Sequence, residues 1–196
     1  SLRFIIHRSL LEKWEKQNDT TISLQTILKI DLTATAVEKR ESNLHYSVRN
    51  GLCDVVSWLI MKYGDDPNQV DNRGRCPLAL CCLSNEYVPD VLKMCQVLLD
   101  CRADPNYPNN LVCNWTPMHY CALKGATSIA KLLITHSTTI ALDGKDSHGR
   151  SALSYACEYG RTELARLITD KIISNGGNNI SIELHNNMNC NIINSC

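Results

Sequence analysis

The sequence predicts an all-α solenoid, in which helix–turn–helix units stack in a row. Three observations predict it. A short motif recurs four times, an apolar helical segment follows each motif, and in three units a glycine separates the two. The motifs begin 34, 40 and 35 residues apart, at Ser42, Cys76, Thr116 and Ser151. A period of this size is typical of repeats that bury one continuous core by stacking.

The first helix of each unit follows a capping position. The four runs read S-N-L-H-Y-S-V, C-P-L-A-L-C-C, T-P-M-H-Y-C-A and S-A-L-S-Y-A-C. Ser42, Thr116 and Ser151 are predicted N-caps, because a hydroxyl oxygen accepts an otherwise unpaired N–H of the first turn. Pro117 then occupies the first helical position, where its missing N–H costs nothing.

The second helix of each unit is predicted from an apolar stripe. It covers residues 55–60, 129–134 and 164–168, after Gly51, Gly125 and Gly160. The second unit reaches its helix, residues 94–99, five residues late, with extra residues near 85–89. Two further departures are a loop at 107–115, which is two residues longer than its counterparts and has no glycine, and an altered turn at 138–144. Such departures mark either a binding surface or tolerated drift in surface loops.

The pattern resembles the ankyrin repeat. Thr116-Pro117-Met118-His119 is close to the T-P-L-H segment of that family, and residues 102–106 match its G-A-D-x-N turn except at Arg102. The resemblance covers residues 38–172. It implies an ankyrin-repeat solenoid with short β-hairpin fingers, in which His45 and His119 bond the backbone of a neighbouring hairpin.

The domain organisation follows from this register. Four repeats are expected at about 38–70, 71–106, 107–145 and 146–172. Residues 1–37 show helical periodicity and suit a divergent N-terminal cap, with a linker from a neighbouring domain as the alternative. The Asn-rich segment 173–196 is either a partial repeat or a linker.

Composition excludes several classes of protein. Lys+Arg and Asp+Glu both number 20, so the chain has no general attraction for nucleic acid. Its longest apolar runs are far shorter than the roughly 20 residues of a membrane span. The first residues do not resemble a signal peptide. Because the sequence does not begin with Met, we expect a piece of a longer protein.

Eleven cysteines indicate either a disulfide or metal framework, or reduced thiols in a core. No C-x-x-C spacing occurs. Cys81, Cys121, Cys82 and Cys157 occupy the two small-residue positions of the ankyrin-like first helix, and Cys95 lies on an apolar stripe. A thiol behaves there as a small hydrophobic group. The cysteines therefore favour reduced thiols and a cytoplasmic location, with the nucleus as another intracellular option.

The sequence gives no sign of chemistry. It contains no G-x-S-x-G, P-loop, G-x-G-x-x-G or H-E-x-x-H motif, and no calcium loop. We expect no catalysis, no cofactor and no bound metal in this chain.

The resemblance implies a binding surface made of fingertips and exposed positions of the first helices. Its cationic and aromatic residues are of the types enriched in binding hot spots. We therefore expect a protein partner with an acidic segment and apolar anchors, bound to a monomer. Tyr46, Leu80, Tyr120 and Tyr155 form a separate column that is expected to pack between first helices. The predicted contact residues are Asn72, Arg73, Arg75, Cys113, Trp115, Lys124, Ser147, His148, Arg150 and Tyr159.

The predicted function is a protein-interaction module that binds its partner on the concave ankyrin face. The alternative is the targeting or regulatory arm of a larger enzyme, or of an acyl-CoA- or lipid-handling protein, whose active domain lies outside this sequence.

Overall fold

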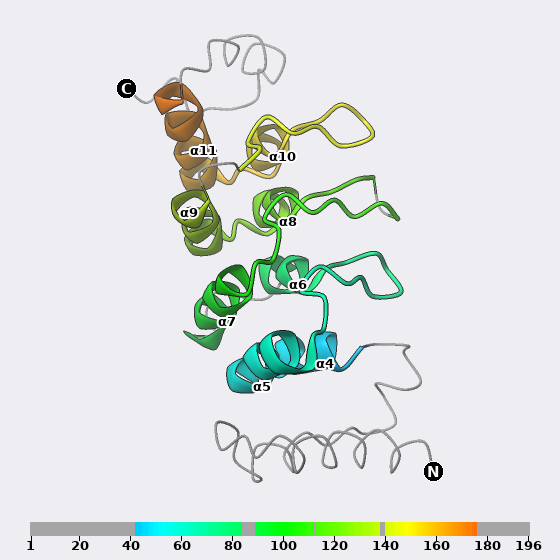
Figure 1. The fold of residues 1–196 in the computed structure, drawn as a ribbon. Helices are drawn as coiled ribbons and strands as arrows, with labels where there is room; N and C mark the ends of the chain where they lie inside the picture. Colours follow the sequence, from blue (N-terminus) through cyan, green and yellow to red (C-terminus); the bar gives the residue numbers. More distant parts are fainter. Residues whose placement is uncertain (1–41, 84–88, 112, 138–139, 176–196) are drawn as a thin grey trace.

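The fold is a stack of helix pairs, seen in a computed structural model that describes residues 42–83, 89–111, 113–137 and 140–175 (Figure 1). Within these residues the fold is helical, and β-structure is limited to isolated bridges in two loops. The fold class is therefore confirmed. The helices are α4 (Asn43–Arg49), α5 (Cys53–Trp58) continued by the π-helix η1 (Leu59–Tyr63), α6 (Pro77–Leu83), α7 (Pro89–Asp100), α8 (Pro117–Lys124), α9 (Thr127–His136), α10 (Ala152–Glu158) and α11 (Thr162–Ser174).

The helices form two layers. The first helices α4, α6, α8 and α10 pack on one another in sequence order, and the second helices α5, α7, α9 and α11 form the layer behind them. Three hairpin loops, which we call the fingers, precede α6, α8 and α10. They project on the same side of the stack (Figure 1). Each finger is thus positioned by the first helix that follows it.

The predicted caps set where the first helices begin. The hydroxyl of Ser42 accepts the N–H of His45 at 3.3 Å, and that of Ser151 accepts the N–H of Ser154 at 3.2 Å. Thr116 is the N-cap residue of α8, with Pro117 directly after it. Each bond pairs one orphan donor of the first helical turn.

Side-chain amides tie successive repeats together. The Asn68 amide oxygen accepts the N–H of Asp104 at 2.8 Å, and that of Asn106 accepts the N–H of Ala141 at 2.8 Å. Asn68 and Asn106 stand at the same place in the matching D-P-N turns. The turn that closes one repeat is therefore bonded to the corresponding turn of the next repeat.

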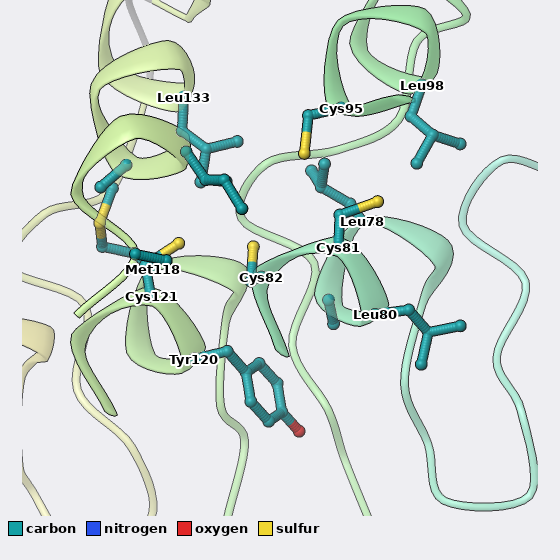
Figure 2. Close-up of a cluster of buried hydrophobic side chains, with 14 of the residues drawn as sticks. Leu78, Leu80, Cys81, Cys82, Cys95, Leu98, Met118, Tyr120, Cys121 and Leu133 are labelled. Atoms are coloured by element: carbon teal, nitrogen blue, oxygen red, sulfur yellow. The ribbon is translucent and has the colours of Figure 1, made fainter. Parts of the chain in front are cut away.

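A continuous apolar core fills the space between the layers. Figure 2 shows its centre, where Leu78, Cys81 and Cys82 of α6 lie close to side chains of α7, α8 and α9. Tyr120 and Tyr155 are also buried, as expected for the column that packs between first helices. Full burial of a large aliphatic side chain contributes about 2 kcal/mol. The largest fully buried side chains are Tyr155, Leu44, Leu59, Leu78, Met94, Leu98, Met118, Ile129, Leu133, Leu153, Leu164 and Ile168.

The cysteines of this core are packing residues, with one exception. The thiols of Cys81 and Cys95 are hydrogen-bonded to each other, as are those of Cys82 and Cys121. These bonds, together with burial, raise the pKa of Cys81 and Cys82, so both stay protonated. The expectation of reduced core thiols is confirmed at these four positions. It is wrong at Cys157, which is buried but disulfide-bonded.

Two backbone features were not predicted. The second helix of the first repeat widens into η1 and ends at Gly64, which is left-handed with φ 86°. The matching position in the second repeat is Arg102, which is also left-handed, with φ 67°. The turn therefore keeps its shape without the family's glycine, at a steric cost of about 1–2 kcal/mol.

Several predicted segments fall outside the described residues. The expected cap at 1–37 lies there, as do residues 85–88 of the insertion at 85–89 and the tail from 176 onward. The four repeat boundaries stay predictions, and α11 continues to Ser174, two residues past the last of them.

Candidate functional site: fingers and concave face

The three fingers share one hairpin geometry, which aligns them residue by residue. In the first finger the N–H of Asp71 donates to the carbonyl of Arg75 at 3.0 Å. The same bond joins Asp146 to Arg150 at 2.9 Å, and Asn109 to Trp115 at 2.8 Å. The second finger therefore has two extra residues between its closing positions. Trp115 stands where the other two fingers have arginine.

The fingertips are set by a second shared bond. The side-chain Oδ1 of each opening residue accepts the N–H two positions later. The acceptors are Asp71, Asn109 and Asp146, and the donors are Arg73 at 2.9 Å, Leu111 at 3.0 Å and His148 at 2.8 Å. Arg73, Leu111 and His148 are therefore equivalent tip residues of adjacent fingers, and all three are exposed. We call these three the tip row.

Two buried histidines hold fingers against helices, as the sequence predicted. The His45 Nε2–H donates to the carbonyl of Arg75 at 2.9 Å, and that of His119 donates to the carbonyl of Arg150 at 3.2 Å. A carbonyl only accepts, so the proton must sit on Nε2 in both rings. The Nδ1 of His119 accepts the N–H of Thr116 at 3.2 Å. Burial lowers the pKa of His119, which favours this neutral form. Both histidines are structural.

The closing residue of the first finger is bonded within the finger. The Arg75 guanidinium donates from Nε at 2.9 Å and from Nη2 at 2.6 Å to the same oxygen of Asp71. The side chains of Arg75 and Asp71 are only 16% and 3% exposed. Burial opposes ionisation of Asp71, but the bonds from Arg75 and from two backbone N–H groups outweigh it and lower the pKa. Most of the charge of Arg75 is therefore neutralised inside the finger.

Asp146, the opening residue of the third finger, is bonded by side chains from outside that finger. The hydroxyl of Tyr155 donates to Asp146 Oδ2 at 2.7 Å, and the indole N–H of Trp115 donates to the same oxygen at 3.1 Å. Burial opposes ionisation of Asp146, but these bonds and two backbone N–H groups hold its pKa well below the usual range. Burial and the bond to Asp146 raise the pKa of Tyr155 to about 12. Trp115 thereby joins the second finger to the third.

The Arg150 side chain, unlike that of Arg75, makes its contacts outside its own finger. Its guanidinium carbon lies 4.2 Å from the centre of the Tyr155 ring, and its Nη1 donates to Glu158 at 3.1 Å. The Trp115 ring packs edge-on against Tyr155, with centroids 5.0 Å apart. Tyr159 stacks on Tyr155 at 6.5 Å and is 47% exposed. Arg150, Trp115 and Tyr159 therefore gather around the Tyr155 ring of α10, and exposed Lys124 lies at the end of α8.

The structure divides the predicted contact residues into three groups. Asn72, Arg73, Ser147 and His148 are exposed on the first and third fingers. Trp115, Arg150 and Tyr159 gather around Tyr155, and Lys124 is exposed at the end of α8. Arg75 is paired internally, and partly buried Cys113 holds the third finger, because its carbonyl accepts the N–H of Ser147 at 2.9 Å.

Sequence reasoning missed one exposed residue, Leu111. The second finger was aligned from its closing end, which placed the tip at Cys113 and Trp115. The bonds of Asn109 place the tip at Leu111 instead, which is 68% exposed. The available signal was the opening position, where Asn109 replaces the aspartates at 71 and 146.

Comparison with protein families agrees with this architecture. A family model described as ankyrin repeats, with three copies, matches residues 87–181, and a second model, described as ankyrin repeat, matches residues 41–69. The chain belongs to the ankyrin-repeat family, whose repeats are protein-interaction modules.

Two curated relatives share the repeat region. The chain is 28% identical over 147 residues to the tyrosine-protein kinase HTK16 of Hydra vulgaris, covering 72% of this chain and 18% of the kinase. It is 27% identical over 136 residues to the probable E3 ubiquitin-protein ligase XBOS34 of Oryza sativa subsp. japonica, covering 69% of this chain and 25% of the ligase. This chain therefore matches a quarter or less of each relative's length.

Two features are absent from the part of the chain that the structure describes. None of the helices there has the length and apolar character needed to cross a membrane. In the same part of the chain, no three His, Cys, Asp or Glu side chains cluster so that they could hold a metal ion.

Proposed function

We propose that this module binds an acidic protein segment with apolar anchors, along the concave side of the third and fourth repeats and across the adjacent fingers. The observation that carries the proposal is the group around Tyr155. Arg150 lies over the Tyr155 ring and Tyr159 stacks on the same ring. The carboxylate of Asp146 accepts several hydrogen bonds within the fold. The surface thus offers an exposed aromatic ring and an arginine whose ion pair with Glu158 is open to solvent, while the nearby aspartate is buried.

These residue types favour protein recognition over chemistry. Exposed Tyr and Arg side chains supply large contact area and directional donors, which is why they dominate binding hot spots. The two most perturbed aspartates, Asp71 and Asp146, are held ionised by several donors each, and both act as hairpin supports. We therefore propose a role without catalysis, for a chain that acts as a monomer.

A second function is favoured by the length of the relatives. Both are named as enzymes, and each is matched over a quarter of its length or less. We propose as an alternative that the repeats form the targeting arm of a longer chain and bring a substrate to a catalytic domain. The binding surface is the same in both proposals.

We also propose an intracellular location. Eight cysteines among the described residues are free, and seven of these are buried. Free thiols in this number favour a reducing compartment. The disulfide at Cys157 is the observation that opposes it.

The test is affinity capture from a lysate of the source organism, read by quantitative mass spectrometry. Wild type is compared with a Lys124→Glu/Tyr159→Ala variant. The matched control is Lys171→Glu/Ile173→Ala, which alters a lysine and an exposed apolar residue of α11. We expect the main captured protein to be lost with the first variant and kept with the control. Equal capture by all three would contradict a concave-face site.

A further inference from the structure

We propose that the tip row, Arg73, Leu111 and His148, is a three-point docking edge. It takes an extended acidic segment that inserts one apolar side chain beside Leu111, between two carboxylates. The inference rests on the proposed function and assigns a specificity to it. Leu111 would be the apolar anchor, and Arg73 and His148 the groups that bind the flanking carboxylates.

Arg73, Leu111 and His148 occupy equivalent positions in their fingers. Each follows its opening residue by two, and each N–H is held by that residue's side chain. The three side chains therefore start from the same place in three successive fingers. They present a guanidinium, an isobutyl group and an imidazole in a row.

The row is held as one unit by bonds between fingers. The Asn109 side chain donates to the carbonyl of Arg73 at 3.0 Å and to the Tyr120 hydroxyl at 2.6 Å. The N–H of Ser147 donates to the carbonyl of Cys113 at 2.9 Å. Leu111 is thus anchored on both sides, so its backbone loses little freedom on binding, which favours affinity.

The second finger also carries local strain that serves this arrangement. Cys113 and Asn114 are both left-handed, with φ of 51° and 58°, although neither is glycine. A left-handed cysteine costs roughly 1–2 kcal/mol, whereas asparagine adopts this conformation more readily. Both residues lie between the tip at Leu111 and the closing residue Trp115. A tip whose leucine is 68% exposed contributes little burial to the fold.

The charge of the row selects the partner. The fingers' own opening carboxylates, Asp71 and Asp146, are buried and bonded beneath the tips. The exposed side chains of the row are an arginine, a leucine and an imidazole whose Nδ1 lies 3.8 Å from Asp146 Oδ2. The guanidinium of Arg73 favours an acidic partner over a basic one.

The spacing of the row sets the spacing of the partner. Packed helices lie about 8–10 Å apart, and neighbouring fingers follow neighbouring first helices. An extended chain rises about 3.3 Å per residue. Adjacent tips are therefore about three residues apart on a bound strand. The expected motif is an acidic residue, two residues of any type, a large apolar residue, two of any type, and an acidic residue.

The experiment uses the whole chain and a phage-displayed library of random 16-residue peptides. Selected peptides are synthesised, and their affinities are measured for wild type, Leu111→Asp and Arg73→Glu. The matched control is Met61→Asp, because Met61 of η1 is 67% exposed and lies outside the fingers. We expect at least tenfold weaker binding for the two tip variants and less than about twofold change for the control, a contrast of about 1 kcal/mol or more.

The outcomes separate the two proposals. Selected peptides with the predicted spacing that lose affinity on Leu111→Asp support the tip row. Peptides that bind wild type and Leu111→Asp equally overturn the tip row and leave the concave-face proposal standing. A library that yields no acidic binder for wild type contradicts both. Leu111→Met, which keeps an apolar tip, should bind as wild type does, so a loss confined to Leu111→Asp follows the polarity of the tip.

Discussion

Two arginines in the first finger, two positions apart, have opposite roles. Arg75 pairs with a nearly buried carboxylate, whereas Arg73 is exposed at the tip. Removing one partner of a buried pair leaves a charge without compensation. We predict that Arg75→Ala lowers the free energy of unfolding by about 2–4 kcal/mol. Arg73→Ala should change it by less than about 0.5 kcal/mol.

Urea unfolding of both variants measures this contrast. Asp71→Asn/Arg75→Ala is the control, because it removes the uncompensated carboxylate and should recover part of the loss. Similar stabilities for Arg75→Ala and Arg73→Ala would mean that the pairing with Asp71 contributes nothing.

His119 should make stability depend on pH. Its folded-state pKa is lowered, mainly by burial, below the ordinary value of 6.5. The unfolded chain then binds more protons than the folded chain between the two pKa values, so this stabilisation is complete above pH 6.5 and declines as the pH falls below it. We predict that wild type loses more stability between pH 7.5 and 5.5 than His119→Gln, as measured by urea midpoints at both pH values. Parallel losses would show that His119 is not held neutral.

At the scale of the finger, comparing two equivalent glycines tests the contact between the first and second fingers. Gly74 of the first finger and Gly149 of the third occupy equivalent turns, with φ of 72° and 75°. A Cβ at Gly74 would meet the Asn109 side chain and lie 2.9 Å from the Leu111 Cβ, whereas a Cβ at Gly149 meets nothing within 4 Å. We predict that Gly149→Ala costs about 1–2 kcal/mol, from backbone strain alone. Gly74→Ala should cost at least about 1 kcal/mol more.

Thermal or urea unfolding of the two alanine variants measures the difference. Equal costs would mean that the first and second fingers are not in contact. That result would also contradict the close approach of Gly74 to Asn109 and Leu111.

Local signals predicted the elements well where a cap and an apolar stripe coincided. Ser42 and Ser151 cap the helices expected of them, and His45 and His119 bond the expected carbonyls. The π-helix at Leu59–Tyr63 could not be predicted, because its residues keep a helical apolar pattern. The tip at Leu111 was missed because two inserted residues can be aligned from either end of a loop, and only the bonds of Asn109 decide between the two.

At the scale of the whole chain, the cysteines follow the core. Seven of the eight free thiols in the described part are buried, and Cys113 alone of these is partly exposed. A buried thiol reacts slowly because it stays protonated and covered. We predict that brief iodoacetamide treatment of the folded protein, mapped by peptide mass spectrometry, modifies Cys113 well before the seven others. Rapid modification of Cys82 or Cys121 would show that the first-helix layer opens readily.

The solenoid as a whole was predictable because the first-helix motif recurs four times at a nearly constant spacing. Which charges face outward was harder to predict, since it depends on partners that are distant in the chain. Trp115 reaches Asp146, 31 residues away, while the Arg150 side chain lies over the Tyr155 ring and bonds Glu158 instead of Asp146. Residue type predicted the proposed contact residues, and internal pairing, as at Arg75, shows which of their side chains are bonded within the fold.

The most direct test of the central claim is site-specific photo-crosslinking. A benzophenone amino acid is placed at Tyr159 on the concave face and, in a second protein, at Ile173, an exposed apolar position of α11. Each protein is irradiated with the captured partner, and the products are identified by mass spectrometry. The proposed site predicts a crosslink from position 159 to an acidic segment of the partner and none from position 173. A crosslink from position 173 alone would place the partner on the second helices and contradict the account.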